Sequence, residues 1–357
     1  MAKYTKIQWC HYTLNFRIGC AKKSICCARC YAALMDRRRF SKTLPGCSKE
    51  KPISHWGANA PRHVVSAQTT KEVYRWNAYA ETHPWTCSGC SEEKDEMFGY
   101  TGDDALKFDY VCPKCHSSLD SSPRRVFVGS MFDWAEEVYT TEERDAWFEV
   151  MEKCTHLRFM LLTKRGKVMR EYLTYRYEGG PVPGHLWIGW SWQPDFPAEI
   201  DDLLAVKAKV RFVSAEPLLG PLGEPMGEAR KGLSAAQIEH EQMKWLEKIY
   251  QVELLILGGE SGDENEDPRM CHEDWLRWAV AGAFAACVKV FVKQMGSYAV
   301  RDDSAVIPEA SEDVVDPADI ARWEFNRRNH RVRYKHPKGG DINEWPEELQ
   351  VQEMPGF

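Results

Sequence analysis

The sequence predicts an α/β fold: a full or partial TIM-type (β/α) barrel with an inserted zinc-ribbon module and an irregular C-terminal extension. Three observations lead to this prediction. Short apolar runs alternate with amphipathic segments from about residue 124 onward, which is typical of βαβ units. Two cysteine-rich segments interrupt the chain before that point. A length of 357 residues suits one large α/β domain with insertions, or two domains.

Six of the predicted strands are buried runs that end in small or polar residues. They are the runs at 124–131, 157–163, 186–191, 210–214, 254–259 and 288–293. Predicted helices lie between them, beginning near Thr141, passing through Met169 and Tyr172, and covering 201–207, 234–250 and 274–286. A further strand at 13–16 would make about seven parallel strands. A doubly wound sheet is the alternative, because hydrophobic periodicity does not separate the two folds.

Composition divides the chain into four parts and excludes several classes of protein. We assign 1–80 to the first part of the barrel with its cysteine loop, 81–122 to the insertion, 123–298 to the rest of the barrel and 299–357 to the extension. No apolar window is long enough to span a membrane, and the N-terminus lacks a secretory apolar core. A net charge of −6 excludes a globally basic nucleic-acid binder. We therefore expect a cytoplasmic protein with no membrane contact.

Thirteen cysteines in such a chain indicate metal binding rather than disulfides. The insertion, with nine acidic and three basic residues, holds two CxxC pairs separated by 21 residues. Four thiolates close a tetrahedron around Zn²⁺ and leave no open position. We predict a structural zinc ribbon on these four, with an auxiliary iron–sulfur cluster as the alternative. The predicted ligands are Cys87, Cys90, Cys112 and Cys115.

The first cysteine segment lies between the strand at 13–16 and a helix predicted over 31–40. Cys20, Cys27 and Cys30 are the predicted ligands of a [4Fe–4S] cluster, with Cys26 as the alternative to Cys27. Three thiolates leave one iron of such a cube without a protein ligand, and an open coordination position is what a catalytic metal site needs. A second zinc site completed by His11, Cys10 or Cys47 is the competing interpretation.

Polar residues recur where the predicted strands end. Because ligands bind at the carboxyl ends of parallel strands, these groups are candidates to line a site, although a Ser or Thr there also caps the following helix. The groups are Ser130 with Asp133, Thr163 with Lys164 and Arg165, Ser191, Ser214 with Glu216, Glu260 with Ser261, and Lys293 with Gln294.

These motifs resemble a phage and bacterial family of radical-SAM-like proteins with a three-cysteine motif, the phage Gp37/Gp68 type, whose function is unknown. The resemblance spans nearly the whole chain, at 5–9, 19–20, 27–32, 126–131, 162–165, 188–191, 211–219, 258–262, 292–294 and 334–341. Two features depart from the expected pattern. The spacing between the cysteines is six and then two, whereas the commonest radical SAM signature has three residues between its first two cysteines. Cys26 stands where relatives often have Gly.

The resemblance implies a mechanism in which a reduced [4Fe–4S] cluster cleaves S-adenosylmethionine (SAM) and starts radical chemistry, with the cofactor carrying the difficult step. The implied SAM contacts are the strand-end groups. Ser130, Thr163 and Ser191 would hold the ribose or the amino acid moiety, Glu216 the ammonium or ribose hydroxyls, and Lys164 or Lys293 the carboxylate. Glu260 ends a Gly-Gly-Glu segment that resembles the one holding the SAM ammonium in relatives; the alternative is a turn that lets a ligand approach the backbone. An electron donor such as flavodoxin or ferredoxin is the implied partner.

The expected substrate is phage nucleic acid or a nucleotide, in the cytoplasm of a bacterial host. Arg37, Arg38 and Arg39, and the segment 322–338 with seven basic residues and one Glu, offer phosphate contacts. A solvated tail and an ordinary charged helix end explain the same residues without a ligand. The alternatives are a non-catalytic zinc and iron–sulfur protein that binds nucleic acid or a partner, and a photolyase-like or isomerase-like repair activity on DNA.

Overall fold

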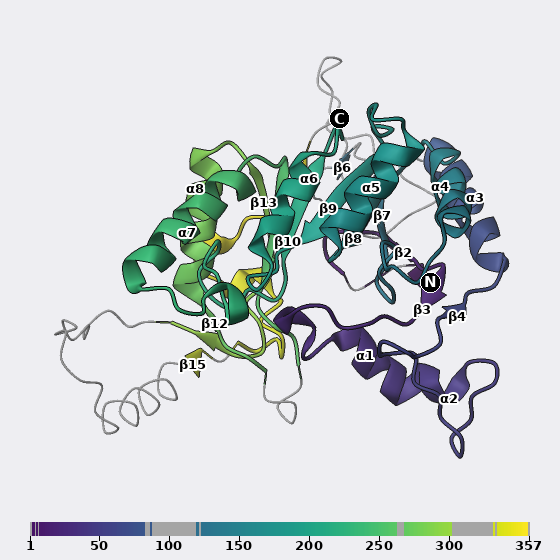
Figure 1. Cartoon of the computed structure of the whole chain (residues 1–357), viewed down its shortest axis with the longest axis horizontal. Helices are drawn as coiled ribbons and strands as arrows, with labels where there is room; N and C mark the ends of the chain where they lie inside the picture. Colours follow the sequence, from purple (N-terminus) through teal and green to yellow (C-terminus); the bar gives the residue numbers. More distant parts are fainter. Residues whose placement is uncertain are drawn as a thin grey trace, which may run out of the picture.

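Seven parallel strands form one curled sheet, a half-barrel, at the centre of the molecule (Figure 1). The computed structural model describes residues 5, 7–82, 123–262, 268–301, 331–332 and 334–355, and the backbone of the strands at 2–3, 86–87 and 119–120. In sheet order the strands are β2 (Tyr12–Leu14), β7 (Arg124–Val128), β8 (Leu157–Thr163), β9 (Leu186–Ser191), β10 (Arg211–Ala215), β11 (Leu254–Gly258) and β13 (Lys289–Gln294). Each of the seven predicted strands is therefore present.

The two edges of the half-barrel are covered by the ends of the chain. β1 (Ala2–Lys3) pairs antiparallel with β2. At the other edge the backbone N–H of Val292 donates to the carbonyl of Val351 at 2.8 Å, and that of Glu353 donates to Val290 at 2.7 Å. Within the described residues β2 and β13 do not pair with each other. The partial barrel is confirmed in this respect, since the sheet curls but stays open.

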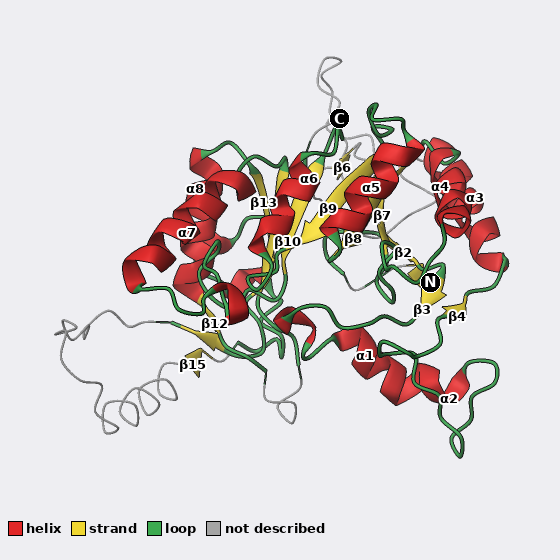
Figure 2. Ribbon diagram, viewed as in Figure 1, coloured by secondary structure: helices red, strands yellow, loops and turns green. Residues whose placement is uncertain are grey.

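Six helices pack on one face of the sheet, which distinguishes this fold from a doubly wound one (Figure 2). They are α3 (Gln68–Thr82), α4 (Thr141–Glu152), α5 (Gly166–Arg176), α6 (Ile200–Leu204), α7 (Ala235–Ile249) and α8 (Glu273–Ala285). Along β7, Val126 and Val128 join the core under these helices, whereas Phe127 joins a separate core on the opposite face with Met160 and Phe212. The period of two along a strand produces this division.

The helices begin at the residues that the sequence favours. The side chain of Thr140 accepts a hydrogen bond from the backbone of Glu143, and the Glu143 side chain accepts one from the backbone of Thr140. This capping box satisfies two of the N–H groups that a helix start leaves unpaired. Ser234 and Gln237 make the same motif at α7.

The helix predicted over 31–40 is not uniform. It consists of α1 (Tyr31–Met35), a π-helical turn η2 (Asp36–Phe40) and a short α2 (Ser41–Thr43). At the start of η2, the buried Asp36 carboxylate accepts hydrogen bonds from the backbone N–H of His55 at 2.9 Å and from its Nδ1 at 2.8 Å. The helix predicted over 31–40 is therefore present, although its second half is a π-helical turn in which the buried Asp36 contacts His55.

The insertion and the extension are described in part. β5 (Thr86–Cys87) pairs antiparallel with β6 (Leu119–Asp120), which brings the two ends of the insertion together. β12 (Cys271–His272), β14 (Ala299–Val300) and β15 (Arg331–Val332) form a small second sheet. The Tyr334 hydroxyl donates to the buried Glu273 at 2.6 Å and ties the extension to α8. No helix in the described part of the chain is long and apolar enough to cross a membrane.

Candidate functional site

The cysteine loop, residues 19–30, leads from β3 (Arg17–Ile18) to α1 at the carboxyl edge of the half-barrel. It begins at Gly19, whose backbone N–H donates to the carbonyl of Met131 at 2.9 Å. Gly19 has φ +123°, and a Cβ there would lie 2.5 Å from the carbonyl oxygen of His55. Only glycine tolerates this conformation and this close approach.

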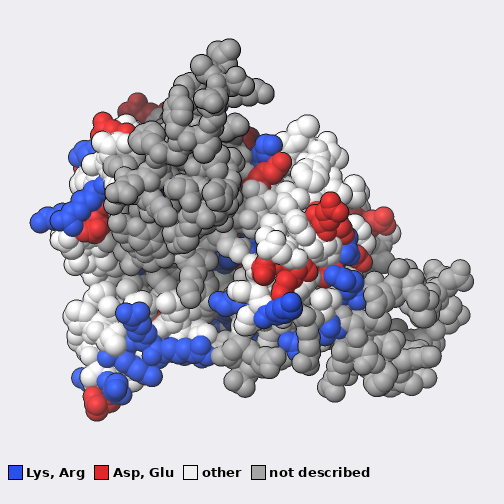
Figure 3. Space-filling model, turned by 180° about the vertical axis from the view of Figure 1, so that it is seen from behind, with Lys and Arg blue, Asp and Glu red and all other residues white. Residues whose placement is uncertain are grey.

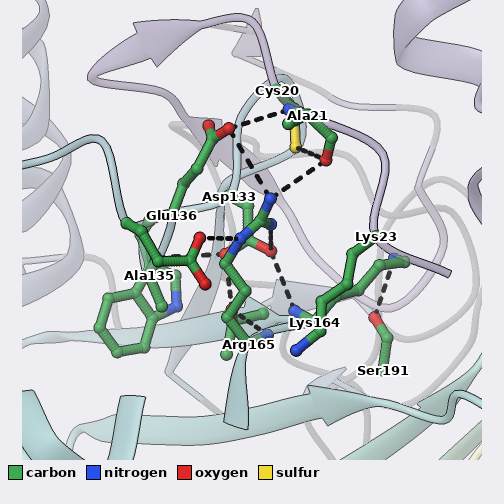
Figure 4. Close-up of polar contacts among 12 residues, drawn as sticks. Cys20, Ala21, Lys23, Asp133, Ala135, Glu136, Lys164, Arg165 and Ser191 are labelled. Carbon is green, nitrogen blue, oxygen red and sulfur yellow. Dashed lines mark hydrogen bonds and ion pairs between the residues drawn. The ribbon is translucent and has the colours of Figure 1, made fainter. Parts of the chain in front are cut away.

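A buried carboxylate after β7 organises the first contact with the loop (Figure 4). Asp133 accepts from the hydroxyl of Thr163 at 2.5 Å, from the backbone N–H of Lys164 at 3.0 Å and from Nη1 of Arg165 at 2.8 Å. Nη2 of Arg165 donates to the carbonyl of Ala21 in the loop at 3.1 Å. Burial alone would raise the pKa of Asp133, but Arg165 and these donors hold it below its usual value.

Glu136 supplies a second contact from the same segment. Its Oε1 accepts from the backbone N–H of Ala21 at 2.9 Å, so both polar backbone groups of Ala21 are held. Arg62 pairs with Glu136, with Nη2 2.6 Å from Oε1 and Nε 2.9 Å from Oε2. Because all these groups are buried, their mutual pairing is required for the fold as well as for the loop.

Residues after β9 and β11 hold the far part of the loop. Asp195 accepts from the hydroxyl of Ser24 at 2.6 Å and from the backbone N–H of Ile25 at 2.9 Å. Arg269 donates to the carbonyl of Ile25 at 2.9 Å and forms an ion pair with Glu260. Charged groups from the sheet edge thus hold the loop at Ala21 and at Ser24–Ile25.

The thiols of the loop share one cationic neighbour, Lys164. The charge of its ammonium group acts on Cys20, Cys26, Cys27 and Cys30. The ammonium group donates to the hydroxyl of Ser191 at 3.2 Å. The Lys164 ammonium group is therefore close enough to these thiols for their charges to interact, and it lies beside Ser191 at the end of β9.

Burial controls the ionisation of these groups. It raises the pKa of the Cys20 thiol to about 12 and that of Cys26 to about 11. Burial alone would lower the pKa of Lys164, but Cys27, Cys26 and Cys30 raise it above its usual value. At neutral pH Cys20 and Cys26 are therefore protonated in the protein alone, and metal binding would displace their protons.

All seven predicted SAM contacts have partners within the protein, and the first three lie near β7, β8 and β11. The hydroxyl of Ser130 accepts from Asn15 at 2.8 Å, Thr163 binds Asp133, and Glu260 binds Arg269. These contacts position the strand ends and the loop. Packing within the protein also explains the glycine at position 259, beside Glu260, because a Cβ there would lie 2.2 Å from the carbonyl oxygen of Met295. The close approach at this turn is therefore backbone to backbone.

The other four predicted contacts lie toward β9, β10 and β13. Lys164 and Ser191 form one pair, as described above. Glu216 and Lys293 form another, with Nζ of Lys293 2.6 Å from Oε1 of Glu216. The hydroxyl of Ser214 donates to the second oxygen of Glu216 at 3.1 Å. These groups are side by side in pairs, each with few partners.

Sequence reasoning missed two buried amides at this edge. Asn15 follows β2 and accepts from the backbone N–H of Met131 at 2.7 Å. Gln193, which is fully buried, donates to the carbonyl of Lys164 at 2.7 Å. Its Oε1 has no hydrogen-bond partner among the described residues. Gln193 lies just beyond the strand predicted at 186–191, which was the available signal for finding it, whereas Asn15 lay inside the strand predicted at 13–16.

Metal ligands can be placed for one of the two cysteine segments. Of the predicted zinc ligands, Cys90, Cys112 and Cys115 lie outside the described residues, and only the backbone of Cys87 is described. Among the side chains that the structure describes, no three of His, Cys, Asp or Glu converge as ligands of a metal ion. Cys20, Cys26, Cys27 and Cys30 are all unpaired thiols.

A family model described as "Protein of unknown function (DUF5131)" matches residues 4–343. The chain belongs to this family. The match covers the cysteine loop, every strand of the half-barrel except β1, and the insertion. No curated protein and no solved structure matches the chain. Family membership in DUF5131 thus defines the extent of the fold without assigning an activity.

Proposed function

We propose that this DUF5131 protein is a radical SAM-type enzyme of the phage Gp37/Gp68 kind, with a [4Fe–4S] cluster on Cys20, Cys27 and Cys30. The observation that carries the proposal is the position of the cysteine loop. It lies across the carboxyl edge of a curled parallel sheet, which is where (β/α) folds bind ligands, and its residues Ala21, Ser24 and Ile25 are hydrogen-bonded to groups that follow the strands.

The donor set fits such a cluster. Each thiolate of a [4Fe–4S] cluster binds its own iron, so the ligands need not converge on one point as they would for a zinc ion. The Lys164 ammonium group near the thiolates offsets their negative charge, which would otherwise destabilise the folded protein. When bound, the cluster would supply an electron for the reductive cleavage of SAM to methionine and a 5′-deoxyadenosyl radical.

The chain's own residues would bind and orient SAM. Lys164, whose charge interacts with all four thiols, would pair with the SAM carboxylate. Glu216 would accept hydrogen bonds from the SAM ammonium or ribose hydroxyls, with Lys293 setting its position. Gln193 offers an unpaired acceptor beside Lys164. An external donor such as flavodoxin or ferredoxin would reduce the cluster, and Zn²⁺ on the insertion cysteines is part of the same proposal.

A second candidate is a non-catalytic metal-binding protein that binds nucleic acid or another partner. One observation favours it: Thr163, Ser130 and Glu260, three of the predicted SAM contacts, are already paired within the protein. Groups with internal partners are less available to a ligand.

Anaerobic reconstitution with iron and sulfide separates the two candidates. We expect about four irons per chain, the content of one [4Fe–4S] cluster. We also expect 5′-deoxyadenosine to form when SAM and dithionite are added. The Cys20→Ala/Cys27→Ala/Cys30→Ala variant should lose both, while Cys287→Ala, which removes an exposed thiol, should lose neither. A separate Cys26→Ala variant identifies the middle ligand. Zinc in place of iron, with no SAM cleavage, would leave the non-catalytic candidate.

A further inference from the structure

A basic lobe projects beside the cysteine loop. We define it as residues 29–51, which include α1, η2 and α2. It holds seven Lys and Arg and two acidic residues, in a chain whose net charge is −6. All seven basic side chains are exposed, whereas one of the two acids, Asp36, is buried against His55. Figure 3 shows these cations gathered on the projecting part of the surface.

Most of this charge is available to a ligand. Among the described residues, the side chains of Arg37, Lys42, Lys49 and Lys51 have no ion-pair partner, and Arg39 lies over the ring of Phe40 at 5.6 Å. Elsewhere on the surface exposed lysines commonly have a carboxylate close by, as Lys231 has Glu228 at 3.5 Å. Unpaired like charges on one small lobe repel one another, which favours binding of an anionic ligand.

Several contacts hold the backbone of the lobe in place. The Asp36–His55 contacts keep the inner side of η2 against the body, so the next residues, Arg37 to Arg39, face outward. π-helical turns are rare and occur often at functional sites. The loop that follows is braced by the backbone N–H of Ile53, which donates to Ser41 at 2.9 Å, and by that of Lys51, which donates to the Ser48 hydroxyl at 3.0 Å. A backbone that is held in place before binding loses less entropy on binding.

The lobe is continuous with the candidate site. α1 begins at Tyr31, the residue after Cys30, and the Tyr31 hydroxyl donates to the carbonyl of Ser130 at the end of β7 at 2.8 Å. Tyr31 as a whole is nevertheless 44% exposed. A long polyanion bound on the lobe would therefore pass close to the thiols, beside an exposed aromatic ring of the kind on which bases stack.

We infer that the basic lobe binds the phosphodiester backbone of a nucleic acid and presents it to the site at the carboxyl edge. Arginine binds phosphate bidentately, and three consecutive arginines are exposed here. The residues between the cations are mainly small or polar, and Met35 and Tyr31 are the exposed large apolar side chains of the described lobe. That surface lacks the apolar face of a membrane-binding helix and the apolar centre of a protein interface. The inference names nucleic acid as the substrate class of the proposed enzyme, and in this respect it rests on the proposed function.

The test measures binding of the full chain to a fluorescein-labelled 20-base-pair DNA, to the matching single strand and to the matching RNA. Fluorescence anisotropy gives the affinity for each probe at salt concentrations between 50 and 200 mM NaCl. The lobe variant is Arg37→Gln/Arg39→Gln/Lys42→Gln. We expect at least one of the three probes to bind, and the variant to lose roughly three units of the log–log salt slope and about tenfold or more in affinity. The matched control is Lys153→Gln/Lys167→Gln/Lys231→Gln, which removes the same charge from exposed lysines outside the lobe and should keep the slope.

Three results would overturn the inference: no binding to any probe at 50 mM NaCl, an equal loss in the control variant, or tighter binding to phosphatidylserine vesicles or polyglutamate than to nucleic acid. Binding is also measured with the Cys20→Ala/Cys27→Ala/Cys30→Ala variant, in parallel with SAM cleavage by the reconstituted protein. If SAM is cleaved but no nucleic acid binds, the inference is overturned and the proposed function stands. If nucleic acid binds through the lobe but SAM is not cleaved, the proposed enzyme is overturned and the nucleic-acid-binding surface stands.

Discussion

The two halves of the carboxyl edge use their charged groups differently. Near β7 and β8, Asp133 and Arg165 each make several contacts, and they join the sheet to the cysteine loop. Near β9, β10 and β13, Lys164 with Ser191 and Glu216 with Lys293 form separate pairs with few other partners. The first half is therefore an anchor for the loop. Apart from the loop contacts of Asp195 and Arg269, the second half holds charged groups with fewer partners, and it is where we expect a ligand to bind.

The largest effect should follow a change in the anchor. Arg165→Met leaves the buried carboxylate of Asp133 without its cation and removes the bond to Ala21. Removing one partner of a buried ion pair costs about 3–5 kcal/mol, so we expect a loss of that size in the free energy of unfolding. Urea denaturation measures it. Glu137 is an exposed partner of the same guanidinium, and Glu137→Gln should change stability by less than about 1 kcal/mol.

The contact at β11 should show a smaller loss of the same kind. Arg269→Gln removes the cation from the buried Glu260 and the donor from Ile25. Because Arg269 is more exposed than Arg165, water can solvate part of the carboxylate, and we expect about 2 kcal/mol. Hydrogen exchange of the loop amides provides the readout. Unchanged protection at Ile25 and its neighbours would show that this contact does not anchor the loop.

The sequence predicted the sheet better than the edge. β8 and β9 have the predicted bounds, because apolar runs with β-branched and aromatic residues specify buried strands locally. The polar strand ends were also predicted as a group. Which of them anchor the loop was not predicted, because this depends on contacts such as that of Asp195 with Ser24, which are 171 residues apart. No local pattern encodes such a pair. Gln193 was missed although its position just beyond the end of β9 offered a local signal.

As the pH is lowered, the protein should first lose stability from the amino-terminal edge of the sheet, where His11 lies, and not from the anchor at the carboxyl edge. Burial, followed by the charges of Arg125 and Arg124, lowers the pKa of His11 to about 3, and its Nδ1 accepts from the backbone of Arg125. The unfolded chain binds this proton near pH 6.5, so stability falls as pH decreases through 6.5 toward 3. The expected loss from His11 is about 2 kcal/mol at pH 5.

Urea midpoints at pH 7 and pH 5 check this prediction, with His11→Gln as the comparison. The glutamine should retain an acceptor without titrating, and the variant should lose less stability between the two pH values than the parent. The pKa of Asp133 is held below its usual value, so the anchor should stay ionised over this range. Equal losses in parent and variant would assign the acid sensitivity to another part of the molecule.

The smallest effect on stability should come from the residue next to Arg165. Lys164→Met removes an ammonium group whose described hydrogen bond goes to Ser191, and it keeps most of the buried aliphatic chain. Leaving one hydroxyl unpaired costs about 1 kcal/mol. If the second half binds the SAM carboxylate, the same change should lower SAM affinity about tenfold or more, since a charge-assisted hydrogen bond contributes roughly 1.5–3 kcal/mol.

Equilibrium dialysis with SAM and urea denaturation of the same two variants compare the halves directly. Arg165→Met should lose stability chiefly, and Lys164→Met should lose affinity chiefly. Lys164→Arg restores the charge with a different shape and should recover part of the binding. A Lys164→Met variant as unstable as Arg165→Met would make Lys164 part of the anchor. The division of the edge would then fall between β9 and β10, with Glu216 and Lys293 as the remaining ligand groups.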